Sequence, residues 1–206
     1  MRGVLRPIDT ATTAVITMEM EKGVIGSLAT MPEMAAEADR LDLAANVGAF
    51  LQTARLNKVQ VVHAIAEWRQ DRKGTTLNTP LLGYLSRFPQ QILTGTEAVE
   101  LVDGLGPEPE DLLSRRYGGL TPFTGTNLDS LLRSCGISTI IAVGASLNVG
   151  VTGLVFEAVS LGYSVIVPAD GVVAVPPEYG EWVLAHSIKP LAEVTTLAEV
   201  SAAIRG

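Results

Sequence analysis

The sequence predicts a three-layer α/β/α domain with a mostly parallel, Rossmann-like sheet. Short apolar runs rich in β-branched residues alternate with helical patterns along the chain, which is the order that parallel βαβ units produce. The clearest unit spans 139–162, where an apolar run, a turn at Gly144 and a helical pattern ending at Gly162 follow one another. In such a unit the amides at the helix start face the carboxyl edge of the sheet, where α/β proteins bind ligands.

The first part of the chain predicts two strands and a long helix. Residues 13–21 are apolar until Glu19, so this strand carries an acid toward the ligand crevice. Apolar side chains then recur at helical spacing over 34–56, which predicts one continuous helix. Residues 58–66 form the second strand. Its His63 is expected to pack in the core, because the two histidines of the chain lie far apart and make a poor metal site.

Residues around 67–97 are predicted to form a lid or interface loop. A polar, irregular segment of this length in a compact domain usually has a function, and its mixed apolar and basic content suits a lid over a small acidic ligand or a subunit contact. Trp68, at the start of the loop, is expected to pack or to line the crevice. The candidates for a subunit contact are its apolar residues Leu81, Leu82, Tyr84 and Phe88.

The second part of the chain continues the alternation. A short strand over 111–117 ends in two cations, Arg115 and Arg116, on the same side of the sheet as Glu19. The remaining elements, in chain order, are a capped helix over 128–134, a strand over 139–143, a helix from 149 to Gly162, a strand over 164–170, a helix over 178–191, a strand over 193–196 and a terminal helix.

Composition limits the classes of function. A chain of 206 residues with 47% hydrophobic and 18% charged residues fits one ordered domain, here taken as 1–206. The net charge of −7 argues against a nucleic-acid partner. No apolar run reaches membrane-spanning length and the first residues lack a signal-peptide core, so a cytoplasmic protein without a membrane partner is expected.

A single cysteine, Cys135, excludes an internal disulfide and a cysteine metal cluster, and no metal or other cofactor is predicted. Because Cys135 precedes Gly136 at the end of a helical pattern, it is expected to be a small buried thiol before a glycine cap.

Three blocks of the chain resemble motifs of a known family, in the expected order. They are Met18-Glu19-Met20-Glu21, then Arg116-Tyr117-Gly118 with Phe123 and Thr126-Asn127-Leu128, and finally Gly144 to Val151 with Gly162-Tyr163. They are similar to the motifs of the isochorismatase-like (cysteine hydrolase) superfamily, and the resemblance covers most of the chain. It implies a hydrolase that acts on a small molecule and assembles as a homodimer or higher homo-oligomer.

The departures from the family pattern bear on the chemistry. Most members use a cysteine nucleophile, an aspartate base and a lysine. In this chain the matching positions hold Gly150, Glu19 and Arg115, with Ser114 and Arg116 as alternatives for the last. Glycine has no side chain and Cys135 lies on another element, so thiolate chemistry is not expected at this site.

One branch of the superfamily that carries glycine, the isochorismatases proper and a related phenazine-pathway hydrolase, cleaves vinyl ethers. There a carboxylic acid protonates the enol ether and water captures the oxocarbenium ion. The resemblance therefore implies an acid role for Glu19, next to Arg115 and Gly150, with a small carboxylated metabolite as substrate. The alternative is a catalytically inactive protein of this fold that binds a small molecule or a partner subunit. Further substrate-binding candidates are Arg116, Phe123, Trp68, Leu147 and Asn148, of which Phe123 is a pocket wall or core residue and Asn148 a helix cap or ligand contact.

Overall fold

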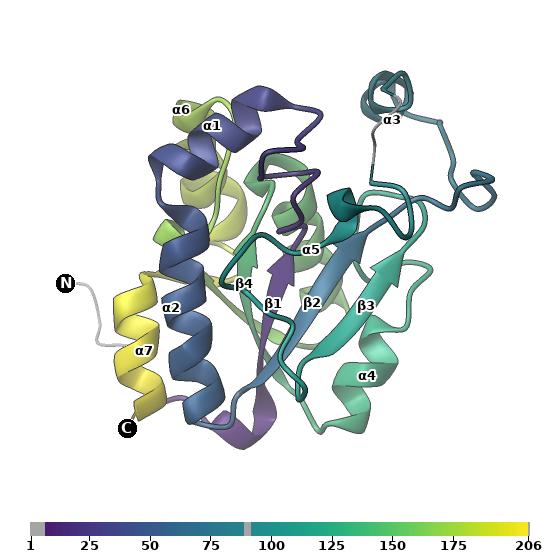
Figure 1. Ribbon diagram of the computed structural model, residues 1–206. Coiled ribbons are helices and arrows are strands. Elements are labelled where there is room, and N and C mark those ends of the chain that lie inside the picture. The colour runs from purple at the N-terminus through teal and green to yellow at the C-terminus, as the bar shows by residue number, and fades with distance from the viewer. Residues whose placement is uncertain (1–6, 89–91, 206) are drawn as a thin grey trace.

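The computed structural model describes residues 7–88 and 92–205 and contains a six-stranded sheet in which every strand pair is parallel (Figure 1). The strand order is β3-β2-β1-β4-β5-β6. The strands are β1 (Thr13–Met18), β2 (Gln60–Ala66), β3 (Leu112–Arg116), β4 (Thr139–Gly144), β5 (Ser164–Pro168) and β6 (Glu193–Thr195). The predicted three-layer α/β/α fold with a parallel sheet is confirmed.

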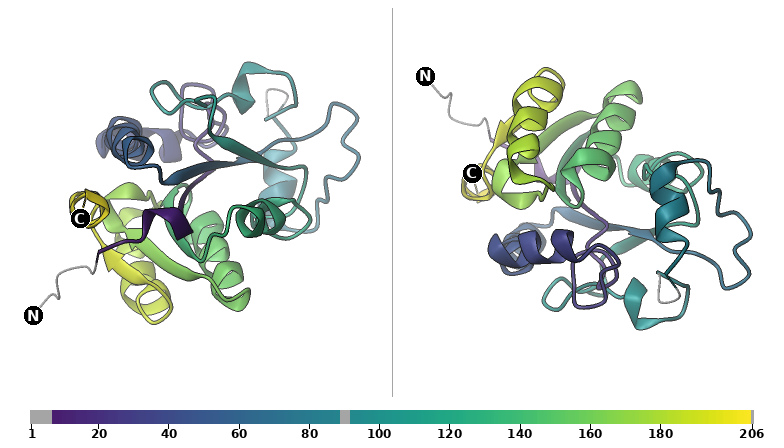
Figure 2. Two further views of the ribbon diagram at one scale, coloured as in Figure 1. Left: turned by 90° about the horizontal axis from the view of Figure 1, so that it is seen from below. Right: turned by 90° about the horizontal axis from the view of Figure 1, so that it is seen from above.

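Helices cover both faces of the sheet (Figure 2). The core on one face combines the sheet with α1 (Pro32–Arg40), α2 (Leu43–Leu56) and α7 (Leu197–Arg205). On the other face the core includes α4 (Leu128–Ser134), α5 (Thr152–Ser160) and the π-helical η5 (Val183–Ile188), which continues α6 (Pro177–Trp182). Along β4 the side chains alternate between the two cores, as the pleat of a doubly covered strand requires.

The single helix predicted over 34–56 is wrong, because the chain breaks between α1 and α2. Asp42 adopts φ +50°, a left-handed conformation that aspartate tolerates better than most residues and that no helix can contain. Pro32 fixes the start of α1 two residues earlier than predicted. The helix predicted over 178–191 is present without a break, as α6 and its π-helical continuation η5.

The segment around 67–97 holds a short helix that the sequence did not reveal, α3 (Pro80–Leu85), followed by η2 (Glu97–Val99). Thr79 caps α3 by accepting the N–H of Leu82 at 3.1 Å, and Pro80 occupies its first turn. The backbone N–H of Glu67 ties the start of the segment to β3 by donating to the carbonyl of Arg116 at 2.9 Å, and the backbone N–H of Trp68 closes the segment by donating to the carbonyl of Ile92 at 2.6 Å. Figure 1 shows α3 beyond the carboxyl edge of the sheet, apart from the helices on its two faces.

The prediction that Cys135 is a buried thiol is wrong. Cys135 is exposed and occupies the C-terminal capping position of α4. In the described residues no helix is long and apolar enough to cross a membrane.

Candidate active site

A cavity of about 280 Å³ lies at the carboxyl edge of the sheet, lined by residues at the ends of four neighbouring strands. Glu19 follows β1, Ala66 ends β2, Arg116 ends β3, and Ser146 and Gly150 follow β4. This is the position at which an open parallel sheet binds ligands, because the strand order reverses between β1 and β4. The predicted convergence of strand ends is therefore present in the structure.

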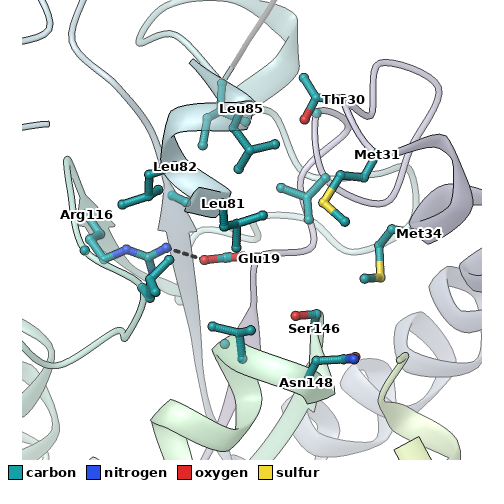
Figure 3. A pocket seen from close by; sticks show the side chains of 18 of the residues that line it. Glu19, Thr30, Met31, Met34, Leu81, Leu82, Leu85, Arg116, Ser146 and Asn148 are labelled. Carbon is teal, nitrogen blue, oxygen red and sulfur yellow. Dashed lines mark hydrogen bonds and ion pairs between the residues drawn. The ribbon is translucent and has the colours of Figure 1, made fainter. Parts of the chain in front are cut away.

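Glu19 and Arg116 form an ion pair within this cavity (Figure 3). β1 ends at Met18, and Glu19 turns away from the sheet with φ +48° while its N–H donates to the carbonyl of Ala64 at 3.0 Å. The side chains of Arg116 and Glu19 are 8% and 18% exposed, so the pair is largely removed from water. The carboxylate and the guanidinium are thus paired where little water reaches them, and the lower local dielectric strengthens their interaction.

Arg115 does not line the cavity, so the structure does not place it beside Glu19 as the sequence predicted. Successive side chains of a strand point to opposite faces, so Arg116 faces the cavity and Arg115 faces away. Arg115 is 42% exposed and donates to Glu67 at 2.8 Å. The other alternative, Ser114, is buried and donates to Asn127 at 3.2 Å. Of the three, Arg116 is the residue that meets Glu19.

Two further candidates lie in the core instead of the cavity. Phe123 is buried and packs on Tyr163, with ring centroids 5.9 Å apart, so it is a core residue rather than a pocket wall. Leu147 is also buried, and its N–H is already used in a 2.7 Å bond to the carbonyl of Val173. Neither residue lines the cavity, so the structure gives no support to the predicted substrate-binding role of Phe123 or Leu147.

Trp68, Asn148 and Gly150 do line the cavity. Asn148 does not cap a helix. It holds the backbone of Val175 by donating to its carbonyl at 2.7 Å and accepting its N–H at 3.1 Å. At Gly150 a Cβ atom would lie 3.0 Å from the Ala145 carbonyl oxygen and 3.0 Å from Met18 Cε, so the floor of the cavity is closely packed around this glycine.

Glu21, for which no role was predicted from the sequence, is a second carboxyl group close to Glu19. Its side chain is fully buried, and burial, followed by the charge of Glu19, raises its pKa well above the usual 4.5. One oxygen accepts the Ala66 N–H at 2.5 Å, and the other has no hydrogen-bond partner among the described residues. Burial therefore favours the protonated form of Glu21 over the charged form, relative to a carboxyl group in water.

The walls of the cavity are mainly apolar. Met31 and Met34 stand on one side, and Leu81, Leu82 and Leu85 of α3 on another (Figure 3). The apolar content of the loop was the signal in the sequence that could have indicated these walls. The apolar side chains predicted to make a subunit contact fall into two groups. Leu81 and Leu82 line the cavity, whereas Tyr84 is 47% exposed and has its ring against Phe88.

His63 is packed in the core, as predicted. Its Nδ1 lies 2.7 Å from the Thr17 hydroxyl and its Nε2 lies 3.2 Å from Asp111, and burial lowers its pKa below 6.5. Within the described part of the chain, no group of three or more histidine, cysteine, aspartate or glutamate side chains is arranged to hold a metal ion.

The position of the cavity, at the carboxyl edge of an open parallel sheet, is the one at which α/β proteins bind small molecules. The sequence profile of the isochorismatase domain matches residues 13–199, and the chain therefore belongs to the isochorismatase family.

Similar proteins include hydrolases and a relative described as inactive. The ureidoacrylate amidohydrolase RutB of Agrobacterium fabrum is 28% identical over 163 residues, which are 70% of this chain and 68% of that protein. A probable inactive nicotinamidase of Arabidopsis thaliana is 30% identical over 135 residues, 65% of this chain and 68% of that protein. A cysteine hydrolase from Pseudomonas syringae pv. phaseolicola superposes with a TM-score of 0.83 at 26% identity, covering 100% of this chain and 99% of that one.

Proposed function

We propose that the protein is a hydrolase that works without a cysteine nucleophile and cleaves the vinyl ether of a small carboxylated metabolite by acid catalysis. The observation that supports this most is the meeting of Glu19, Arg116 and Gly150 in one cavity. The lining residues include a carboxyl group able to transfer a proton and a guanidinium able to bind a carboxylate, but no thiol.

The reaction needs only proton transfer and water. Glu19 gives its proton to the terminal carbon of the enol ether, which leaves an oxocarbenium ion. Water adds to the cationic carbon and returns a proton to Glu19. The resulting hemiketal breaks its bond to the ether oxygen, giving a ketone and an alcohol. The sum is one vinyl ether plus one water, and Glu19 ends with the proton that it began with.

Arg116 links substrate binding to the proton on Glu19. In the free protein its guanidinium is paired with Glu19. A substrate carboxylate competes with Glu19 for this guanidinium, and the proposed acid catalysis requires Glu19 to carry a proton once Arg116 is bound to the substrate. We expect the non-hydrolysable ether 2-cyclohexyloxypropanoate to bind with uptake of up to one proton, measured by calorimetry in buffers of different ionisation enthalpy. Glu19→Gln should bind it without this uptake.

The test of the activity is turnover of 2-cyclohexyloxyacrylate, isochorismate and small amides, followed by NMR. We expect a vinyl ether to be hydrolysed by the wild type, and Glu19→Gln to lose at least about a hundredfold in rate, the usual contribution of a general acid. Glu193→Gln, at an exposed position of β6, is the matched control and should keep full activity. Amide hydrolysis that survives in Glu19→Gln would contradict the proposal.

The second candidate function is binding without turnover. It is favoured by the mutual neutralisation of Glu19 and Arg116 in the free protein and by the likeness to a probable inactive nicotinamidase. The same panel separates the two candidates, because a binding protein would retain 2-cyclohexyloxypropanoate with a measurable affinity and hydrolyse none of the vinyl ethers or amides.

We also propose a cytoplasmic homodimer or higher homo-oligomer, formed by a single domain in which the segment around 67–97 acts as a lid over the cavity. The contacts of Leu81, Leu82 and Leu85 with the cavity support the lid assignment of that segment over a subunit contact. Light scattering coupled to size-exclusion chromatography tests the oligomeric state, and a monomeric mass at micromolar concentration would reject it.

A further inference from the structure

We infer that this cavity selects ligands with an apolar body and a single carboxylate, and that α3 together with the start of α1 sets the preference for the apolar body. The inference rests on the proposed function in that it takes the cavity as the substrate site. It concerns the class of substrate and not the bond that is cleaved.

The charges of the cavity set the first limit. Among the described lining residues, Glu19 and Arg116 are the charged ones, and they neutralise each other. One ligand carboxylate can take Arg116 in exchange for Glu19. A second carboxylate would find no further cation in the lining and would be desolvated without a partner, which is costly.

One polar side chain of the lining, that of Asn148, offers little to a second polar group. Both polar atoms of the Asn148 amide are engaged with the backbone of Val175. A ligand group that sought this amide would have to break two existing hydrogen bonds and would gain little in exchange. Asn148 therefore shapes the cavity more than it binds.

The walls set the second limit, since they are built from flexible apolar side chains on two separate segments. Met31 and Met34 come from the start of α1, while Leu81, Leu82 and Leu85 come from α3 (Figure 3). Removing a ring or branched alkyl group from water against these walls is favourable in proportion to the area buried. Methionine side chains adapt to irregular shapes, so the walls fit several apolar bodies of similar size.

α3 presents two distinct faces. Leu81 and Leu85 are four residues apart and lie on the same face toward the cavity, and Leu82 beside them is buried. Tyr84 points away and is 47% exposed. None of these residues touches the Glu19–Arg116 pair by a hydrogen bond or ion pair. Selectivity and chemistry are therefore carried by different segments and can be altered separately.

Binding of unreactive acids tests the inference without requiring turnover. The first matched pair is 3-phenylpropanoate and 2-phenylsuccinate, which differ by one carboxylate. The second pair is 3-phenylpropanoate and propanoate, which differ by the ring. Calorimetry should give at least about tenfold tighter binding of 3-phenylpropanoate in both comparisons. Equal or tighter binding of 2-phenylsuccinate or of propanoate overturns the inference.

Variants of α3 locate the selectivity. Leu81→Ser and Leu85→Ser should each weaken 3-phenylpropanoate by about tenfold and leave propanoate unchanged, because they remove apolar wall. Tyr84→Ser, on the outer face of the same helix, should change neither. Circular dichroism and thermal melting verify that each variant is folded, and unchanged 3-phenylpropanoate binding by both folded leucine variants contradicts the assignment.

The two proposals fail separately. If 3-phenylpropanoate binds with the expected preferences but no vinyl ether is hydrolysed, the ligand class stands and the hydrolase proposal fails. If a vinyl ether bearing two carboxylates is hydrolysed faster than 2-cyclohexyloxyacrylate, the hydrolase proposal stands and the ligand class fails.

Discussion

At the scale of single residues, Glu21 couples the site to pH. Burial, and then the charge of Glu19, raises its pKa well above 4.5, so the folded protein keeps a proton that the unfolded chain releases as pH rises through 4.5. The stability that depends on this group is therefore complete below pH 4.5 and is lost as pH rises toward the folded pKa. Glu21→Gln keeps the shape and the acceptor for the Ala66 N–H without this linkage. We expect Glu21→Gln to melt several degrees above the wild type at pH 8 and close to it at pH 4.5.

The control for this experiment is Glu33→Gln, an exposed position in the first turn of α1. Its melting temperature should follow that of the wild type at every pH. A wild-type protein that melts above Glu21→Gln at pH 8 would show that Glu21 is ionised and well solvated there, contrary to its burial.

Gly150 is a second residue whose environment allows a prediction. An added Cβ would press on the Ala145 carbonyl and on Met18 Cε, both 3.0 Å away. We expect Gly150→Ala to lose about 1–3 kcal/mol of stability, as overpacking in a core does, and to bind 3-phenylpropanoate more weakly. Gly83→Ala in α3, whose Cβ would meet nothing within 4 Å, is the control and should be neutral or slightly stabilising. Chemical denaturation measures both, and equal stabilities of the two variants would contradict the packing argument.

The sequence identified Glu19 and Gly150 as candidates but could not choose between Arg115 and Arg116. The motif placed a cation at the end of β3, and the two arginines differ only in the face to which they point. A shift of one residue in a strand exchanges its faces, so the choice depends on the pairing register of β3 with β2. Leu147 and Phe123 were misplaced for a related reason, since apolar residues near a motif can turn into the core or into the cavity.

At the scale of elements, a buried polar network joins α2 to the strands β1 and β2 and to Asp111, the residue that precedes β3. Asp111 accepts two hydrogen bonds from Arg55 of α2, at 2.6 and 3.2 Å, and lies 3.2 Å from His63 of β2, which contacts Thr17 of β1 at 2.7 Å. The carboxylate of Asp111 is 2% exposed. Asp111→Asn leaves Arg55 without a charge partner in a largely buried position, so we expect a loss of about 3–5 kcal/mol in the free energy of unfolding.

The contrasting pair for Asp111 is Asp71 with Arg69, which are 41% and 52% exposed. Asp71→Asn should cost less than about 1 kcal/mol, because exposed ion pairs contribute little. Urea denaturation of both variants at pH 7 decides the matter, and a loss for Asp111→Asn no larger than that for Asp71→Asn would mean that the network does not hold α2 to the sheet.

Strands β1, β2, β4 and β5 were predictable because each is a compact, mainly apolar run between turn residues. Helix limits were not. The apolar stripe over 34–56 continues through Asp42, and only the left-handed backbone at that residue separates α1 from α2. α3 has six residues, too few for a periodic pattern, and its capping by Thr79 is visible only once the fold is known.

At the scale of the whole molecule, the two edges of the sheet have different roles. The cavity lies at the carboxyl edge, beyond the end of β4. Cys135 lies at the opposite edge, four residues before β4 begins at Thr139, and it is exposed. The six residues of β4 span about 20 Å, so the sole thiol of the sequence is far from Glu19 and Gly150.

This separation makes the cysteine-independent chemistry directly testable. Cys135 should react fully with a thiol reagent such as 5,5′-dithiobis(2-nitrobenzoate) in the folded protein, releasing one equivalent of thionitrobenzoate per chain. Modification should change neither vinyl-ether turnover nor 3-phenylpropanoate binding, and Cys135→Ser should behave as the wild type in both assays. Loss of turnover on modification, with unchanged melting temperature and with the same loss in Cys135→Ser, would require a thiol in the reaction and would move the chemistry away from the cavity that holds Glu19 and Arg116.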